Sequence, residues 1–265
     1  MLVNGISGNM ISIRDRGLLY GDGVFRTLCI SNGQPQHWPL HYQKLQNDCA
    51  ALGIVCPDGL SDELAVLVAA HPDAVVKIIV TRGQNIRGYT PAFDVIPAHI
   101  WDVTALPVYP SGYENQGVVV RLCELRLGHQ PQLAGIKHLN RLENVLAAAE
   151  LAGTEAQEGL LLDAEGLVIE GVRSNLFLFS QGRLITPSLS RCGVAGVQRD
   201  RVMAGAAKLG MPIDVRNVEL AELFCADELF LTNSVFGLWP VAQLEQQHWT
   251  DFSRTSKIRA VLELK

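Results

Sequence analysis

The chain has 265 residues, of which 48% are hydrophobic and 18% charged, so it can form one large core or two modest ones. Its formal net charge of −5 gives no basic face for nucleic acid, and no apolar run is long enough to cross a bilayer. The N-terminus is broken by Gly and Asn and does not have the pattern of a signal peptide. The scattered cysteines form no C-x-x-C pair, which suits a reducing cytosol better than a disulfide framework or a zinc site.

Strands and helices are predicted in alternation along the first hundred residues. A tight turn is expected at Asn4-Gly5, and the segment 14–23, rich in Gly and Asp, is expected to be a turn or loop. Ser61 is a plausible N-cap for the helix that it opens. The other predicted elements are strands over 24–30, 75–81 and 100–106, and helices over 41–52 and 61–70.

The segment 107–117 contains Pro, Gly and Tyr and is expected to link two domains, 1–106 and 118–265. Beyond it, the sequence again alternates between strand and helix patterns. The predicted elements are a strand from Val118, a helix over 138–152, a hairpin over 159–170, a hairpin turn at Gln181-Gly182, a helix ending at Leu209, a strand over 228–232 and a terminal helix over 251–265.

A lone lysine, Lys137, lies where an irregular segment meets the helix predicted over 138–152. Apolar neighbours favour the neutral amine, which is the form that condenses with an aldehyde to give a Schiff base. The alternative is a solvated loop lysine, and spacing alone favours that alternative because most lysines lie in water.

The segment GIKHLNRLEN, which contains Lys137, resembles the cofactor-lysine segment of the fold-type IV enzymes that use pyridoxal 5′-phosphate (PLP). The longer string from Arg126 to Glu143 is most similar to the aminodeoxychorismate lyases of that family, and the similarity extends in the same order from Asp15 to about Val241. The resemblance implies an α+β protein with the two-domain fold-type IV fold, similar to D-amino-acid aminotransferase. It also implies a PLP-carrying lysine in the C-terminal domain, a cofactor between the domains and a homodimer.

The same resemblance assigns Glu170 to the cofactor ring. The segment from Glu170 is similar to the family's E-x-x-x-x-N-L-F, in which the glutamate faces the pyridine nitrogen, and Asn175 would be a further cofactor-binding residue. An adjacent anion keeps the pyridine protonated, and a protonated pyridine is a strong electron sink. Without the resemblance, Glu170 would be assigned to a solvent-facing strand end.

The resemblance also implies four residues that hold the cofactor phosphate. Val197 and Gln198 would act mainly through backbone N–H groups, in a glycine-containing loop that opens a helix. Ser234 would replace a threonine hydroxyl, and Gln198 stands where relatives have a threonine. Lys44 occupies the arginine position of the family's H-x-x-R-L helix and would act as a point charge rather than a bidentate fork. The alternatives are a solvated Lys44 and glycines that merely make the turn.

Three residues are candidates on the substrate side. Thr27 follows a segment similar to the family's R-x-x-x-x-G-D-G loop and would place a hydroxyl near the reacting carbon. Arg87 and Tyr89 lie in a loop similar to the S-R-G-x-x-x-R-G-Y loop of the lyase branch, where an arginine would suit a substrate with carboxylates. Solvation of Arg87 is the alternative.

The resemblance thus implies a lyase that converts 4-amino-4-deoxychorismate to 4-aminobenzoate and pyruvate in folate biosynthesis, with Lys137 as cofactor anchor and general base. An aminotransferase acting on D-amino or branched-chain amino acids is the alternative, and a PLP-binding protein without turnover is a third possibility. The expected partner is a small-molecule substrate. The protein is also expected to be a homodimer and to lie in the cytoplasm. No metal, nucleic acid or membrane is expected.

Overall fold

The computed structural model describes residues 1–84, 88–92 and 95–263. The chain divides into two compact units, the first formed by Met1–Val108 with Ile136–Asn140 and the second by Tyr109–Gly135 with Arg141–Lys265. Lys137 therefore belongs to the first unit, although the segments on either side of it belong to the second. The segment 107–117, expected to be a linker, includes the short helix α4 (Gly112–Asn115).

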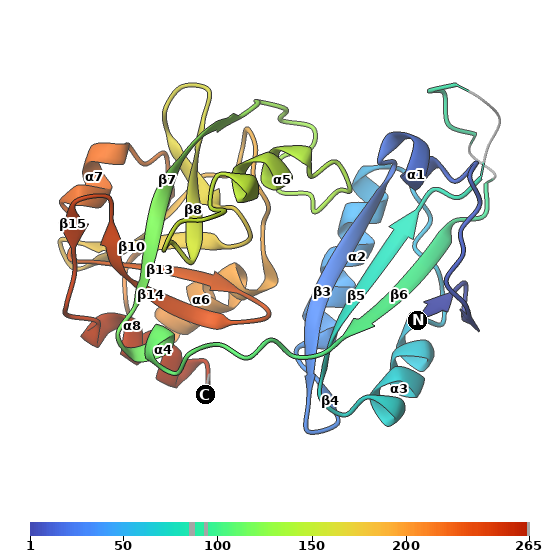
Figure 1. Cartoon of the computed structure of the whole chain (residues 1–265), viewed down its shortest axis with the longest axis horizontal. Helices are drawn as coiled ribbons and strands as arrows, with labels where there is room; N and C mark the ends of the chain where they lie inside the picture. The colour runs from blue at the N-terminus through green and yellow to red at the C-terminus, as the bar shows by residue number, and fades with distance from the viewer. Residues whose placement is uncertain (85–87, 93–94, 264–265) are drawn as a thin grey trace. The chain divides into compact units, whose positions relative to one another are not determined.

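The first unit is built on a six-stranded antiparallel sheet with the order β2-β1-β6-β5-β3-β4 (Figure 1). The predicted strands over 24–30 and 75–81 are confirmed, and the strand predicted over 100–106 begins and ends two residues earlier. The strands are β1 (Leu2–Val3), β2 (Ile6–Ser7), β3 (Gly23–Ser31), β4 (Gln34–Pro35), β5 (Ala74–Thr81) and β6 (Ala98–Thr104).

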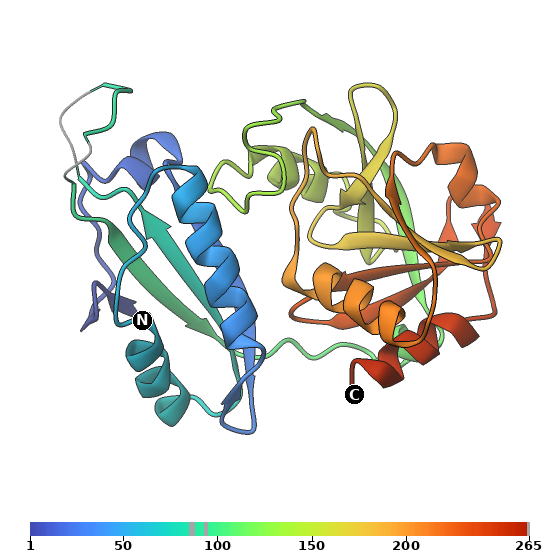
Figure 2. The same cartoon turned by 180° about the vertical axis from the view of Figure 1, so that it is seen from behind.

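Two helices, α2 (Trp38–Ala51) and α3 (Leu60–Ala70), cover one face of this sheet (Figures 1 and 2). Side chains alternate along β3, so Val24 and Leu28 point into the core beneath the helices, together with Leu45 of α2. Helix α3 begins after Gly59, so Ser61 is not the N-cap as predicted; its hydroxyl instead accepts a hydrogen bond from the indole of Trp38 at 3.0 Å.

The segment 14–23 is not wholly a loop as predicted, because it contains the short helix α1 (Arg16–Tyr20). The Asp15 carboxylate accepts hydrogen bonds from the backbone N–H groups of Gly17 (2.8 Å) and Leu18 (3.4 Å), which is the geometry of an N-cap. Gly21 ends the helix in the left-handed region at a φ of 66°, which glycine adopts without strain. The sequence predicted a turn rather than a helix here because Asp15, which caps the helix, belongs to a residue type that is also common in turns.

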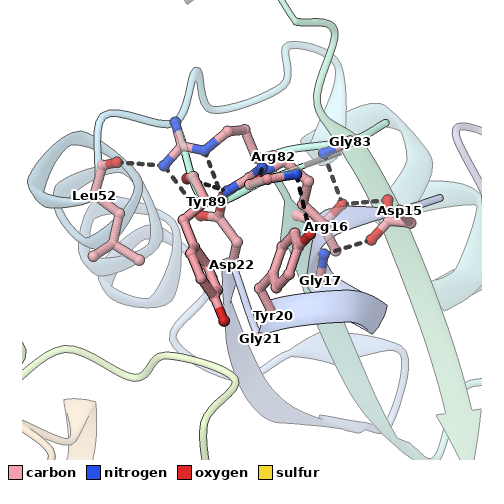
Figure 3. A network of polar contacts seen from close by, with 12 residues as sticks. Asp15, Arg16, Gly17, Tyr20, Gly21, Asp22, Leu52, Arg82, Gly83 and Tyr89 are labelled. Carbon is pink, nitrogen blue, oxygen red and sulfur yellow. Dashed lines mark hydrogen bonds and ion pairs between the residues drawn. The ribbon is translucent and has the colours of Figure 1, made fainter. Parts of the chain in front are cut away.

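Asp22 lies between two arginines that approach it from different segments (Figure 3). The guanidinium of Arg16 donates to its carboxylate at 2.7 Å, and that of Arg82 donates to both carboxylate oxygens, at 2.8 and 3.0 Å. Burial raises the pKa of Asp22, but Arg82 and Arg16 outweigh burial and hold the pKa below its ordinary value of 3.8. The ionised carboxylate therefore ties the segment after α1 to the segment after β5.

Replacing Asp22 by Asn is expected to lower the free energy of unfolding by about 1–3 kcal/mol near neutral pH, because two guanidinium groups lose a charged acceptor. Since the folded pKa lies below 3.8, the unfolded chain takes up the proton first as the pH falls, and the stabilisation in the wild type is lost through the folded pKa. Urea unfolding of both proteins, at neutral pH and in steps below pH 3.8, measures this difference. A difference that stays constant with pH would contradict the assignment.

The second unit is built on a nine-stranded mixed sheet with the order β12-β11-β10-β13-β14-β7-β8-β9, in which β15 pairs with β14 (Figure 1). The predicted hairpins over 159–170 and at Gln181-Gly182 are confirmed. The strands are β7 (Val118–Leu127), β8 (Glu158–Asp163), β9 (Val168–Gly171), β10 (Asn175–Ser180), β11 (Arg183–Pro187), β12 (Ile213–Arg216), β13 (Glu228–Asn233), β14 (Gly237–Leu244) and β15 (Gln247–His248).

Helices α6 (Val197–Lys208) and α8 (Ser253–Val261) lie beside each other and pack on β13 (Figure 2). Their contact with the sheet buries Phe177 and Phe230, whose rings stack at 5.1 Å, against Val202. Two shorter helices, α5 (Leu142–Ala149) and α7 (Leu220–Phe224), complete the unit. No helix within the described ranges has both the length and the apolar character that a membrane crossing requires.

The helix predicted over 138–152 is shorter than expected, because α5 begins at Leu142 and ends at Ala149. The residues before it are committed to another partner: Lys137 O accepts from the N–H of Phe25 at 2.9 Å, and the N–H of Leu139 donates to Gly23 O at 3.0 Å. Backbone groups that pair with a strand cannot also begin a helix. The periodicity of Leu and Ala therefore predicted the helix but not its start.

Candidate active site

Lys137 extends the free edge of β3 in the first unit. Besides the two backbone bonds at Phe25 and Gly23, Val24 and His138 form an antiparallel bridge. From the other direction, the N–H of Lys137 donates to the Asp48 carboxylate on α2 at 3.2 Å. The backbone of the lysine is thereby fixed on both sides.

The Nζ atom of Lys137 lies 4.7 Å from the centre of the Phe25 ring. The Nζ atom of Lys77, on β5, lies at the same distance from that ring, 4.7 Å. Thr27 is opposite Lys77 in the β3–β5 register and two residues from Phe25, so it shares their face of the sheet. Two amines therefore lie at one aromatic ring, and Thr27 shares their face of the sheet.

A buried ion pair supports Lys137 from beneath the sheet. Asp48, on α2, pairs with the guanidinium of Arg26, which lies on the helix-covered face of β3. Burial raises the pKa of Asp48 above its ordinary value, against the opposing effects of Arg26 and of the Lys137 N–H. Lys44, one turn earlier on α2, also acts electrostatically on this carboxylate. Its predicted phosphate contact stays a prediction.

In the second unit, Glu170 is a buried carboxylate on β9, only 3% exposed. Its Oε2 atom accepts from the N–H of Val194 at 2.9 Å and from the side-chain amide of Asn175 at 3.3 Å. The alternative of a solvent-facing strand end is therefore wrong. A buried carboxylate needs hydrogen bonds and positive charge, and Glu170 acts electrostatically on the half-buried Arg141 and the buried Arg199.

Asn175 connects Glu170 to the N-terminus of α6. Its amide nitrogen also donates to Val194 O at 2.8 Å, and its amide oxygen accepts from the N–H of Gly196 at 3.2 Å. A Cβ atom on Gly196 would lie 2.4 Å from that oxygen, so the loop needs glycine there to approach the amide. One side chain thus fixes both the carboxylate and the loop that begins the helix.

Val197 and Gln198, predicted to lie in the loop that opens the helix, instead form the first turn of α6, and both are 3% exposed. The amide oxygen of Gln198 accepts from Arg201 at 2.8 Å, whereas its buried Nε2 atom has no hydrogen-bond partner in the described part of the chain. A buried donor without an acceptor is costly. The orphaned donor, the free N–H groups of the helix and its positive dipole end together suit an anion such as a phosphate.

The other predicted residues differ in how the structure places them. Ser234 lies in the turn between β13 and β14, where the Asn233 side chain accepts from the N–H groups of Val235 and Phe236 at 2.9 Å each. Tyr89 is 85% exposed, and Arg87 lies outside the described residues. Among the described residues, no group of three or more His, Cys, Asp or Glu side chains could hold a metal ion.

Comparison with known proteins matches residues 23–244 to the family described as amino-transferase class IV. The chain belongs to this family. An aminodeoxychorismate lyase of Vibrio harveyi is 36% identical over 242 residues, which is 91% of this chain and 89% of that relative. A crystal structure of 4-amino-4-deoxychorismate lyase from Pseudomonas aeruginosa has 44% identity and a TM-score of 0.96, covering 99% of this chain and 97% of that one.

The branched-chain amino acid aminotransferase of Escherichia coli shares the fold, with a TM-score of 0.84 and 21% identity over 96% of this chain and 88% of its own. These class IV structures confirm the expected α+β, fold-type IV architecture.

Three residues near Lys137 in the candidate active site were not predicted from the sequence: Lys77, Asp48 and Arg26. The sequence does give one indication that Lys77 is unusual, because it is the single charged residue in the apolar strand AVVKIIVT. Arg26 interrupts the apolar strand β3 in the same way. Asp48 left no signal, because an aspartate near the end of an amphipathic helix resembles a solvated one. Only the tertiary contact with Arg26 and Lys137 distinguishes it.

We expect Gln198→Leu to weaken cofactor binding by about 10- to 100-fold, since a hydrogen bond to a charged acceptor contributes about 1.5–3 kcal/mol. The same change removes a buried orphan donor, so the melting temperature without cofactor should stay equal or rise. Titration with the cofactor and thermal unfolding in its absence measure the two effects. Arg201→Met is the control, because it removes the partner of the Gln198 oxygen and keeps Nε2. Equal affinity for cofactor in Gln198→Leu and the wild type would refute the assignment.

Proposed function

We propose that this chain is a lyase that converts 4-amino-4-deoxychorismate to 4-aminobenzoate and pyruvate with pyridoxal 5′-phosphate as cofactor. The observation that carries the proposal is the likeness to the Pseudomonas aeruginosa lyase, at 44% identity over 99% of this chain. Relatives named D-alanine aminotransferase are more distant, at 28% identity.

The residues of both units fit this cofactor. The first unit offers the Lys137 amine, fixed on β3 and flanked by an aromatic ring. The second offers the Glu170 carboxylate and, joined to it through Asn175, a helix N-terminus at which the Gln198 Nε2 atom has no hydrogen-bond partner among the described residues. An amine for an aldehyde, an acid for a pyridine nitrogen and an anion site for a phosphate are the three groups that this molecule requires.

Bound pyridoxal phosphate supplies an aldehyde that condenses with amines and a ring that accepts electrons. Glu170 would hold a proton on the ring nitrogen, and the Asn175 amide and the N–H of Val194, which both donate to it, fix the carboxylate in place. Val197, Gln198, Ser234 and Lys44 would hold the phosphate. The Lys137 amine, once released by the amine of the substrate, would take the proton from the substrate carbon that bears nitrogen.

Thr27, Arg87 and Tyr89 stay the proposed substrate-side residues, and Lys77 joins them. Lys77 and Thr27 lie on the face of the sheet to which the Lys137 amine points, at the Phe25 ring. Since 4-amino-4-deoxychorismate carries carboxylates, a second ammonium group beside the reactive amine would bind one of them. Loss of the enolpyruvyl group as pyruvate makes the product ring aromatic, so the protein chiefly needs to bind, orient and move one proton.

Product analysis tests the proposal. The purified protein is incubated with 4-amino-4-deoxychorismate, and 4-aminobenzoate and pyruvate are measured. A second incubation supplies D-alanine or a branched-chain amino acid with a keto-acid acceptor. Pyruvate and 4-aminobenzoate in equal amounts support the lyase. If only the second incubation gives a product, a keto acid, the protein is an aminotransferase and not a lyase. If the protein retains cofactor but gives neither product, it is a cofactor-binding protein without turnover.

We propose, further, that the protein works as a homodimer in the cytoplasm. Family membership supports the dimer, and the four buried cysteines, Cys29, Cys49, Cys123 and Cys192, suit a reducing compartment. Light scattering of the purified protein and fractionation of the source cells test the two statements separately.

A further inference from the structure

One guanidinium, that of Arg16, holds the backbone of the loop that carries Tyr89 (Figure 3). Its Nη1 atom donates to Gly88 O at 2.8 Å and its Nη2 atom to Tyr89 O at 2.9 Å, while its Nε atom donates to the Asp22 carboxylate at 2.7 Å. The Arg16 residue is only 4% exposed. Two consecutive carbonyl groups that bind one planar fork have a fixed orientation, so the peptide between them cannot rotate.

The aromatic side chains beside this fork complete the contact. The Arg16 guanidinium lies 4.9 Å from the centre of the Tyr20 ring, and the Tyr20 and Tyr89 rings are 5.4 Å apart. The N–H of Gly88 donates to the Tyr20 hydroxyl at 3.4 Å. Tyr89 itself is 85% exposed and contributes nothing to a core. A buried arginine that fixes an exposed tyrosine indicates that the position of the tyrosine matters beyond folding.

The same turn also holds the lysine segment. Gly21 O accepts from the side chain of Asn140 at 3.2 Å and Gly23 O accepts from the N–H of Leu139 at 3.0 Å, so both neighbours of Asp22 bind residues just after Lys137. A Cβ atom on Gly21 would lie 2.3 Å from the Asn140 side chain, which explains the glycine there. Within the first unit, the turn thus joins the loop of Tyr89 to the segment of Lys137.

We propose that Arg16 is a positioning residue for substrate binding: it fixes the Gly88–Tyr89 backbone relative to the Lys137 segment and so sets where the Tyr89 side chain meets the substrate. The proposal rests on the proposed function, in which Tyr89 contacts the substrate. It assigns Arg16 no part in cofactor binding. Arg16 is therefore expected to govern the Michaelis constant for the substrate rather than the cofactor spectrum.

Arg82 is a matched control, because it also donates to Asp22 and to two consecutive carbonyl groups. Those carbonyls are Leu52 O and Gly53 O at the end of α2, at 2.7 Å each. Arg16→Lys and Arg82→Lys each keep the charge and lose the fork. Any effect of disturbing Asp22 alone is thus common to both variants, and only Arg16→Lys loses the hydrogen bonds to Gly88 O and Tyr89 O.

The experiment compares three quantities in both variants and the wild type. We expect Arg16→Lys to raise KM by about 10- to 100-fold, because small misplacements of a binding group have effects of this size, with kcat and the visible absorbance of bound cofactor nearly unchanged. Arg82→Lys should lower the melting temperature similarly with KM within about threefold. Equal KM changes in both variants, or a loss of cofactor in Arg16→Lys, would overturn the proposal.

Hydrogen exchange separates this proposal from the proposed function. Arg16→Lys should speed exchange of the amides from Gly88 to Thr90, and Arg82→Lys should speed exchange near Leu52 instead. If the wild-type protein lacks lyase turnover but Arg16→Lys still exchanges faster than the wild type at Gly88, only the proposed function is refuted. Unchanged exchange at Gly88 in Arg16→Lys would refute the proposal that Arg16 fixes the Gly88–Tyr89 backbone. If Arg16→Lys does not fold, Arg16→Gln, which also lacks the guanidinium fork, is the second variant, and an unchanged KM in it would equally refute the proposal.

Discussion

Replacing Lys137 by Ala is expected to abolish the visible absorbance of covalently held cofactor and to lower kcat by at least about 10³-fold, because in the proposed mechanism this amine is both the cofactor anchor and the proton acceptor. The fold should be little affected. The backbone of Lys137 is hydrogen-bonded to Phe25 and to Asp48, and that of Leu139, two residues later, is bonded to Gly23. None of these contacts uses the Lys137 side chain. Absorption spectra, borohydride trapping and turnover of 4-amino-4-deoxychorismate measure the effect.

Two other lysines provide controls for this change. Lys208→Ala, at the end of α6, removes a surface amine and should leave the spectrum and kcat unaltered. Lys77→Ala removes the second amine at the Phe25 ring and should leave the absorbance in place while it raises KM, by about 10-fold for one lost charged hydrogen bond. A normal cofactor spectrum in Lys137→Ala would mean that another lysine carries the ring, with Lys77 the first candidate.

Replacing Glu170 by Gln is expected to lower kcat by about 10²- to 10³-fold with the cofactor still bound, since removal of one fixed group that stabilises developing charge has effects of this size. An amide cannot hold a proton on the ring nitrogen as a carboxylate does. Its oxygen can still accept from the N–H of Val194, so the loop before α6 should keep its place. Turnover and cofactor titration separate the loss of chemistry from a loss of binding.

Glu228 offers a control that is matched in its surroundings. It is 2% exposed and accepts backbone N–H bonds from Arg254 and Thr255 at 2.9 Å each, at the start of α8. Glu228→Gln therefore alters a buried, doubly hydrogen-bonded carboxylate of the same unit. We expect it to lower the melting temperature without changing kcat. Equal losses of kcat in both variants would show that Glu170 acts through stability alone.

Much of the fold was predictable because its signals are local. Apolar β-branched runs gave strands β3 and β5, and a helical period gave α2. The errors lie where a residue has a partner far away in the sequence. Helix α5 begins late because residues 137–139 pair with β3, and α1 escaped notice because its capping aspartate also signals a turn.

For the candidate site, resemblance supplied Lys137 and Glu170, whose residue types alone predict solvated groups. It could not supply Lys77, since nothing in one sequence shows that two lysines, separated by sixty positions, lie at one phenylalanine ring. Nor could it show that Asn175 binds the carboxylate and the helix loop together. Such contacts depend on register and on loop geometry, which composition does not encode.

The insertion of Ile136–Asn140 into the first unit has a consequence for how this family can evolve. The polypeptide passes from one unit to the other three times, so no single cut separates them. A recombination event at residues 107–117 would bring in a foreign lysine segment together with the second unit, and that segment would have to pair with an unrelated β3. Exchange of whole units between relatives is thus constrained by residues 137–139, because they pair with β3 of the first unit.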